Sequence, residues 1–292
     1  MLGPTCAGKT ELSLRIAEHL HVPVINADSR QIYAELPIGT AAPTAEQQRR
    51  VRHYFVGTLH VGDYYSASMF ESDVMKLLGR LFQASDTALM SGGSMMYIDA
   101  VCNGIDDIPT IPDSVRLMMR QRLESEGLEA LCAELARLDP EYFAIVDRNN
   151  WRRVVHALEI CHTTGGTYTA LRKHSRRQRP FNILKIGVTR QRQELYERIN
   201  SRVGDMMAHG LVDEARRMYP QRGKNALYTV GYRELFAFFD GSGTLDDAAE
   251  RIRSNTRRYC RKQLTWFKRD KEIRWFEPPN IEEIINYIDA NV

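Results

Sequence analysis

The sequence predicts an α/β protein: a P-loop-type parallel sheet core flanked by helices, with an all-helical insertion domain. A glycine-rich phosphate-loop motif opens the chain at residues 3–10, and short apolar runs then alternate with helical patterns. Strands that alternate with helices are typical of parallel sheets with crossover connections. A long middle segment shows only helical spacing. We therefore expect a discontinuous core, residues 1–112 and 181–292, interrupted by a helical insertion domain of residues 113–180.

The motif at residues 3–10 fits G-x-x-x-x-G-K-[ST] at every fixed position. In such a loop the backbone N–H groups turn inward on an anion, Lys9 supplies a point charge, and the Thr10 hydroxyl holds a Mg2+ ion on the phosphates. Residues 11–19 continue with helical spacing, and the N-terminus of a helix favours the same anion. The motif predicts polyphosphate binding without saying which polyphosphate. The predicted contacts are Gly3, Pro4, Thr5, Cys6, Ala7, Gly8, Lys9 and Thr10.

The segment before the loop is short for this motif. A phosphate loop needs a buried strand feeding it, and only Met1 and Leu2 precede Gly3. Either the sequence lacks the beginning of this strand or the strand is unusually short, and we favour the first.

Short apolar runs predict the other strands of the core. They lie at residues 22–26, 54–56 and 88–90, and residues 181–188 return the chain to the sheet. The helical patterns of the core cover residues 11–19, 67–82, 193–209, 211–218, 231–239 and 246–268.

Polar residues follow two of these strands. Residues 27–31 come after the first run, and the turn at residues 91–94 contains Gly92 and Gly93. Ligands of doubly wound sheets bind at the carboxyl ends of the strands. The glycine pair suits a backbone that approaches a ligand closely, and it suits a plain tight turn equally well.

The insertion is predicted from helical spacing alone. Asp113 suits the N-cap of its first helix. Its apolar positions are Val115, Leu117, Met118, Leu123, Leu128, Leu131, Leu135, Val154, Val155, Leu158 and Ile160.

The net charge of +3 is modest but unevenly distributed. Residues 172–179 contain no acid, and residues 251–271 carry nine Lys or Arg against one Asp. Clusters of this kind commonly contact phosphate backbones. The alternative is a solvated basic helix face.

Composition excludes several other classes of protein. No apolar run approaches the roughly 18 residues of a membrane span, and no charged-then-apolar leader precedes the loop, so we expect a cytoplasmic protein without a membrane partner. The five cysteines are scattered and form no C-x-x-C pair, which argues against a disulfide framework and a zinc site.

Several stretches in this order resemble the tRNA dimethylallyltransferase (tRNA isopentenyltransferase) family of the bacterial type, whose members prenylate adenosine 37 beside the anticodon. The resemblance covers nearly the whole chain. The matching stretches are residues 3–10, 28–33, 39–41, 65–67, 92–94, 152–159, 195–199, 230–234 and 256–266.

The resemblance implies an unusual use of the phosphate loop. The loop would hold the diphosphate of dimethylallyl diphosphate, with Mg2+ bridging its two phosphates. The N6 amine of adenine would attack the allylic C1, and diphosphate would leave. Because an allylic carbon tolerates cationic character, stabilising negative charge on the leaving group lowers the barrier most.

The resemblance also assigns catalytic roles to Asp28, Thr10 and Arg192. Asp28 would take the proton from N6; the alternatives are a Walker-B-type Mg2+ ligand and a helix N-cap. Arg192 would close on the diphosphate as a second cation. Arg190, Arg198 and Arg202 lie close by in sequence and stay open as alternatives for this contact.

The expected macromolecular partner is the anticodon stem-loop of tRNA, bound by a monomer with no obligate protein partner. Its adenine would leave the stack and enter a channel, and the insertion and the basic helix near 251–271 would hold the stem by its phosphates. Trp266 and Trp275 are either stacking platforms or core residues. The predicted tRNA contacts are Asp28, Ser29, Arg30, Gln31, Ser94, Arg116, Arg152, Arg153, Val154, Val155 and His156.

Three other functions compete with this one. A P-loop ATP-dependent kinase or NTPase would use the same loop, but residues 28–31 and the basic C-terminal helix speak against it. A prenyltransferase acting on free adenine nucleotide would not need the clusters at 172–179 and 251–271. A catalytically silent RNA-binding module would have no use for Lys9, Thr10 and Asp28.

Overall fold

The computed structural model describes residues 1–173 and 177–292. The chain forms two compact units, here called the core unit (Met1–Cys102 with Arg179–Val292) and the helical unit (Asn103–Gln178). None of the helices in the described ranges combines the length and the apolar character that a membrane span requires.

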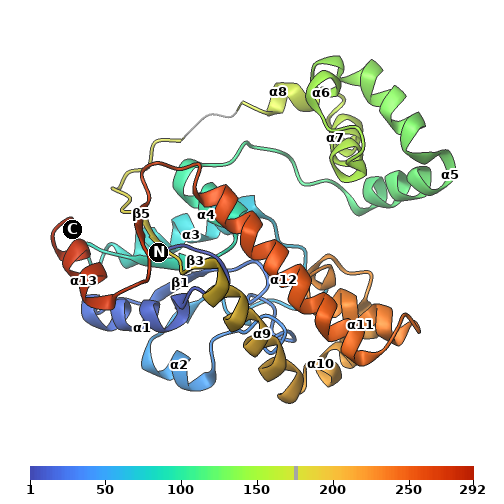
Figure 1. Ribbon diagram of the computed structural model, residues 1–292. Helices are drawn as coiled ribbons and strands as arrows, with labels where there is room; N and C mark the ends of the chain where they lie inside the picture. The colour runs from blue at the N-terminus through green and yellow to red at the C-terminus, as the bar shows by residue number, and fades with distance from the viewer. Residues whose placement is uncertain (174–176) are drawn as a thin grey trace. The chain divides into compact units, whose positions relative to one another are not determined.

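The core unit is built on a parallel sheet (Figure 1). Its strands are β1 (Val24–Ala27), β2 (His53–Tyr54), β3 (Leu89–Gly92), β4 (Ile186–Val188) and β5 (Arg274–Phe276). The strand order is β2-β1-β3 in one set and β4-β5 in the other. Leu2 joins the two sets, because it forms parallel bridges to both Gly92 and Gly187. Residues 1–2 thus take the place of the strand that feeds the phosphate loop.

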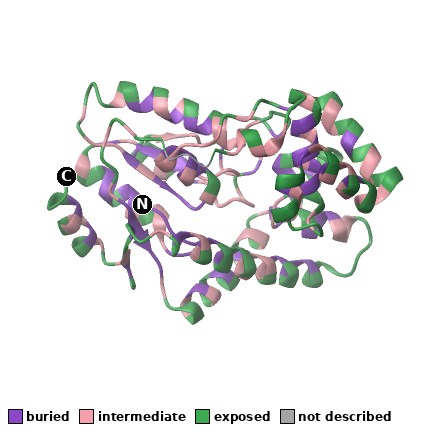
Figure 2. Ribbon diagram, turned by 90° about the horizontal axis from the view of Figure 1, so that it is seen from above, coloured by how far each residue is buried: buried purple, intermediate pink, exposed green. Residues whose placement is uncertain are grey.

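Helices cover both faces of this sheet or pack beside it. They are α1 (Lys9–Leu20), α2 (Ala45–Arg50), α3 (Ala67–Leu81), α4 (Met95–Asn103), α9 (Arg192–Ala208), α10 (Leu211–Met218), α11 (Tyr232–Phe239), α12 (Leu245–Phe267) and α13 (Ile281–Asp289), with short 3-10 turns at Tyr219–Gln221 and Asn225–Leu227. Successive strand residues point to opposite faces. Accordingly Val24 packs in a cluster with α1, α9 and α13, whereas Ile25 packs with α3 and α4. A third cluster joins α9, α10, α11 and α12 to residues 32–38. Figure 2 shows these buried stripes on the inward sides of the helices.

The predicted α/β class is confirmed, and the strand boundaries shift in detail. The predicted run at residues 54–56 ends at Tyr54, because Phe55 adopts a left-handed conformation with φ 63°. Of residues 181–188, only the last three form a strand. The edge strand β5 was not predicted, since its three residues begin with an exposed Arg274 and give no apolar run.

The helical unit contains α5 (Asp113–Leu138), α6 (Pro140–Ile145), α7 (Trp151–Thr164) and α8 (Tyr168–Leu171), and no strand among its described residues. Helix α5 is kinked at Gly127, whose φ of 80° and ψ of 170° are not helical. Buried side chains of α5, α6 and α7 form a separate core. Asp139 closes it: its carboxylate accepts the Tyr142 N–H and both the N–H and hydroxyl of Thr169.

The helical unit begins ten residues before the predicted boundary at 113. The Arg177 N–H donates to Asn103 O at 2.8 Å, and the Arg177 side chain packs on Gly104. The entering and leaving segments are therefore held together from residue 103 onward.

The basic segment 172–179 does not behave as one surface. Residues 174–176 lie outside the described residues. Arg172 packs over the Tyr142 and Tyr168 rings. Arg179 is buried in the core unit, where it pairs with Glu71 of α3 at 2.5 Å and donates to the carbonyls of Ala100 and Val101. Its role in the structure is to anchor the returning chain to α3 and α4.

Candidate phosphate and acceptor site

A cavity of about 580 Å3 lies in the core unit. The phosphate loop, the turn after β1, the end of β3 and helices α9 and α12 all contribute to its walls. The carboxyl ends of β1 and β3 meet here, as expected for a parallel sheet. The cavity therefore brings together the phosphate loop and Asp28, which are separated along the chain by the whole of α1 and β1.

Lys9 lies at the loop end of the cavity and holds the loop closed on itself. Its Nζ donates to Gly3 O at 3.0 Å and to Pro4 O at 2.6 Å. Burial, together with the nearby Arg202 guanidinium, lowers the pKa of Lys9 to about 8. An anion in the loop would reverse this shift, because an opposite charge favours the protonated amine.

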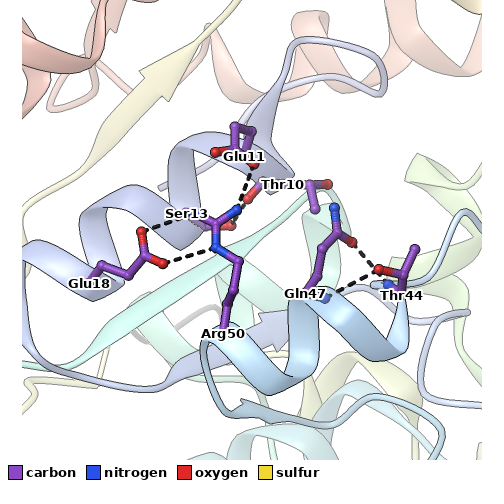
Figure 3. Close-up of polar contacts among 7 residues, drawn as sticks. All are labelled: Thr10, Glu11, Ser13, Glu18, Thr44, Gln47 and Arg50. Carbon is purple, nitrogen blue, oxygen red and sulfur yellow. Dashed lines mark hydrogen bonds and ion pairs between the residues drawn. The ribbon is translucent and has the colours of Figure 1, made fainter.

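Helix α2 is fastened to α1 beside the loop (Figure 3). Arg50 pairs with Glu18 at 3.0 Å and with Glu11 at 3.4 Å, and a capping box between Thr44 and Gln47 starts α2. Ser13 Oγ donates to the Thr10 carbonyl, which braces the first turn of α1. These contacts place Gln47 on the cavity wall near Thr10 and Glu11.

Asp28 follows β1 directly and is fixed by the turn that it caps. Its Oδ1 accepts the Arg30 N–H at 2.8 Å and the Gln31 N–H at 3.3 Å. One carboxylate oxygen of Asp28 therefore caps a turn, whereas the alternative named from the sequence was the N-cap of a helix. Oδ2 takes no part in these two bonds, and Asp28 lines the cavity.

The rest of the acceptor-side loop is held by polar contacts behind it. Ser94 Oγ accepts the Ser29 N–H at 2.7 Å and donates to Ser29 Oγ at 3.0 Å. Gln31 Nε2 donates to the carbonyls of Thr40 and Ala41, both at 3.0 Å. Ser94 is buried and does not line the cavity, whereas Ser29, Arg30 and Gln31 do. Ser94 therefore supports Ser29 from behind instead of facing the cavity.

The predicted second cation, Arg192, lies elsewhere. Its Nε donates to Tyr196 Oη at 3.0 Å on the exposed side of α9, and Arg192 does not line the cavity. Further along α9, Arg198 donates to Cys6 O at 2.9 Å and Arg202 to Thr5 Oγ1 at 3.3 Å. Both line the cavity. The sequence could not separate these arginines, because only the face of α9 that packs on the loop decides among them.

The other predicted contacts with nucleic acid belong to the helical unit. Arg152 and Arg153 are exposed at the start of α7, and Arg152 stacks over the Trp151 ring at 4.6 Å. His156 is half-exposed beside Glu159. Val154 and Val155 are buried in the core of the unit. Their side chains cannot contact RNA without unpacking that core, so the prediction for these two positions does not agree with the structure. Arg116 lies on α5.

Two predicted alternatives are resolved by packing. Trp266 and Trp275 pack against the cluster formed with α3 and α4, which supports core residues over stacking platforms. A Cβ on Gly92 would lie 2.1 Å from the Ala27 carbonyl oxygen. The neighbouring strand is therefore sufficient to require glycine at this position.

Sequence reasoning missed the roles of two buried polar residues at the cavity, of which Gln263 lines it and Glu214 does not. Glu214 of α10 accepts the Ile38 and Gly39 N–H groups and the Tyr232 hydroxyl, and so fixes the loop that Gln31 contacts. Gln263 of α12 contacts the phosphate loop itself. The position of Gln263 in the helix could have indicated its role. It lies between Cys260 and Phe267 on the buried stripe of α12, where a polar side chain needs hydrogen-bond partners.

Known proteins match this chain over nearly its whole length. A family model described as IPP transferase matches residues 31–270. The tRNA dimethylallyltransferase 1 of Bacteroides fragilis is 57% identical over 100% of this chain and 97% of its own, and the protein of the same name from Phocaeicola vulgatus is 58% identical over 99% and 97%. The crystal structure of the full-length tRNA isopentenylpyrophosphate transferase from Bacillus halodurans is 33% identical, with a TM-score of 0.72 over 99% of this chain and 94% of that one. The chain belongs to the IPP transferase family.

Proposed function

We propose that this protein transfers a dimethylallyl group from dimethylallyl diphosphate to N6 of adenosine 37 in tRNA and releases diphosphate. The observation that carries the proposal is that one cavity is lined by a phosphate loop, a carboxylate and an apolar wall. The names of the relatives, tRNA dimethylallyltransferase, support the same reaction.

The phosphate loop would bind the leaving group. Loop N–H groups and the Lys9 ammonium would surround the bound anion, and Arg198 and Arg202 reach the loop from α9. Negative charge grows on the bridging oxygen as the C1–O bond breaks. Fixed cations and N–H groups at that point stabilise the transition state more than the ground state. We propose Arg198 and Arg202 for the role that the family resemblance implies for Arg192.

The oxygen donors around the loop fit Mg2+. Thr10 lies in the first turn of α1 and lines the cavity, and carboxylate and hydroxyl oxygens are ligands that Mg2+ prefers, together with substrate phosphates. Thr10 would hold the ion. When bound, Mg2+ would neutralise charge on the diphosphate.

The apolar wall supports an isoprenoid as the group transferred. It consists of Ile199, Val203, Met206, Val230 and Ile252. A five-carbon allyl chain gains from burial against such a surface, and the exclusion of water protects the allylic cation character at C1.

Asp28 would accept the proton from N6. Its position at the end of β1 is fixed by two backbone N–H groups, while Oδ2 takes no part in that cap. A base must be held within hydrogen-bond reach of the proton that it removes. Ser29, Arg30 and Gln31 continue the cavity wall and would contact the extruded nucleotide.

The tRNA would contact two surfaces. One is the exposed start of α7 in the helical unit, with Arg152, Arg153 and His156. The other is the basic face of α12 in the core unit. Unpaired bases stack on aromatic rings and on guanidinium planes, and the exposed Trp151 and Arg152 pair offers both. We propose the anticodon stem-loop as the bound part and a monomer as the active form.

The test is incubation of the protein with unmodified tRNA and labelled dimethylallyl diphosphate, followed by nucleoside mass analysis. We expect a five-carbon addition on adenosine 37. Free adenine nucleotide in place of tRNA should give no product. Brisk cleavage of nucleoside triphosphates without any prenylated nucleoside would instead favour the NTPase alternative.

A further inference from the structure

Gln263 is a buried polar residue that joins α12 to the phosphate loop. Only 2% of it is exposed. Its Oε1 accepts the Thr5 N–H at 2.9 Å, and its Nε2 donates to Gly93 O at 2.8 Å. Both ends of the side-chain amide are therefore occupied, one by the loop and the other by the turn after β3.

This contact removes one N–H group from the loop. In a phosphate loop the consecutive backbone N–H groups form a concave nest that donates to the anion. The Thr5 N–H belongs to the first half of that loop, and Gln263 already satisfies it. A phosphate oxygen at this end of the nest would have to displace the glutamine.

Gln263 also limits the space beside Lys9. A Cβ built on Gly93 would lie 2.5 Å from Gln263 Nε2 and 3.7 Å from Lys9 Nζ, so both nitrogens lie close to the glycine. Any larger residue at position 93 would push the glutamine away. Gln263, Gly93 and Lys9 therefore close one end of the nest together.

We propose that Gln263 is a positioning residue that sets how long a polyphosphate the nest accepts, favouring a diphosphate over a triphosphate. This inference rests on the proposed binding of a diphosphate in the loop. A third phosphate would need donors at the end of the nest, and there the Thr5 N–H is committed to a neutral, buried side chain. Displacing it would leave buried donors and acceptors unpaired.

The chemistry of the side chain explains why an amide suits this position. A glutamine both accepts and donates, as the Thr5 N–H and the Gly93 carbonyl require. A glutamate could accept but not donate, and its charge near Lys9 would repel any phosphate. An apolar side chain of the same length would leave both backbone groups unsatisfied.

The experiment is isothermal titration of the full-length protein with pyrophosphate and with tripolyphosphate, each in the presence of Mg2+. The wild type should prefer pyrophosphate. In Gln263→Ala the Thr5 N–H is released, and the preference should shift toward tripolyphosphate by about tenfold or more, the equivalent of one hydrogen bond to a charged group. Gln263→Glu should weaken the binding of both anions. Thr265→Ala, an exposed change on the same helix, should leave the ratio as in the wild type.

An unchanged ratio of the two dissociation constants in a folded Gln263→Ala protein would overturn the proposal. If the alanine variant does not fold, Gln263→Asn is measured instead, because an amide shorter by one methylene cannot span both partners, and the same criterion applies. A wild type that binds neither anion would contradict the proposed function itself, whereas a wild type that binds both equally would contradict only the role of Gln263.

Discussion

The carboxylate of Asp28 has one observed role and one proposed role, and a single substitution can separate them. Oδ1 caps the turn through the N–H groups of Arg30 and Gln31. The proposed proton transfer needs a basic oxygen, which an amide lacks. Asparagine keeps an acceptor for the cap and removes the base, whereas alanine removes both.

We therefore expect Asp28→Asn and Asp28→Ala to lower turnover alike, by about 10²–10⁴-fold, as loss of a general base does. Binding of tRNA should stay nearly intact, as measured by filter binding at fixed salt. An Asn variant with wild-type turnover beside an inactive Ala variant would assign Asp28 to the cap alone.

Lys9 should make anion binding depend on pH. In the free protein its pKa is lowered to about 8, first by burial. As the pH rises through 8 the amine loses its proton, and affinity for pyrophosphate should fall. Arginine stays charged in this range. Titrations between about pH 7 and 9.5 should therefore show a steeper loss of affinity in the wild type than in Lys9→Arg, and equal slopes would place the pH dependence elsewhere.

The lowered pKa of Lys9 also makes the free energy of unfolding depend on pH. The usual pKa of 10.5 applies in the unfolded chain and about 8 in the folded one. Between these values the unfolded chain binds more protons, so the contribution of Lys9 to the free energy of unfolding rises with pH.

At the scale of elements, α12 serves both the cavity and the surface. Its buried stripe carries Gln263 toward the phosphate loop. On its exposed side Arg261 donates to Tyr196 Oη at 2.9 Å and Arg257 to Asn200 Oδ1 at 2.8 Å, both on α9. The Arg261 hydrogen bond lowers the pKa of Tyr196. Helices α9 and α12 thus present guanidinium groups held in place by polar partners, which suits contact with phosphates.

Charge reversal on this face should weaken tRNA binding. For Arg257→Glu and Arg261→Glu we expect a lower affinity and a salt slope smaller by about one for each phosphate that the arginine neutralised. The control is Lys76→Glu on the exposed side of α3, which changes the net charge equally away from α12. A salt slope that is the same in all three variants would mark the α12 face as merely solvated.

At the scale of the whole molecule, the features that could be predicted are those that a short stretch of sequence encodes. The phosphate loop and most strands and helices of the core unit are encoded locally and were predicted, whereas α2, α4, α13 and β5 were not. The proposed choice of Arg198 and Arg202 over Arg192 depends on which side of α9 packs against Cys6 and Thr5. No local pattern contains that information.

Burial explains the other differences between the predicted and the observed roles of side chains. Val154 and Val155 match a family stretch linked to tRNA, yet their helical spacing already placed them on an apolar face. Arg179 belongs to a basic run in the sequence but forms a buried ion pair with Glu71. In both cases the side chain serves the fold. For the two valines the apolar spacing already indicated this role, whereas for Arg179 only the tertiary contacts reveal it.

The two units have separate cores, so they should lose stability separately. Leu131 is fully buried in the helical unit and Leu14 in the core unit. Truncation of a buried leucine to alanine costs about 2–5 kcal/mol. Leu131→Ala should therefore speed hydrogen exchange in peptides of residues 113–171 while exchange in the sheet and the affinity for pyrophosphate stay unchanged. Leu14→Ala should do the reverse, because α1 carries the phosphate loop.

Transfer to tRNA should fall in both variants, since it needs both units. Exchange that accelerates throughout the chain after either change would mean that the two units unfold as one cooperative body.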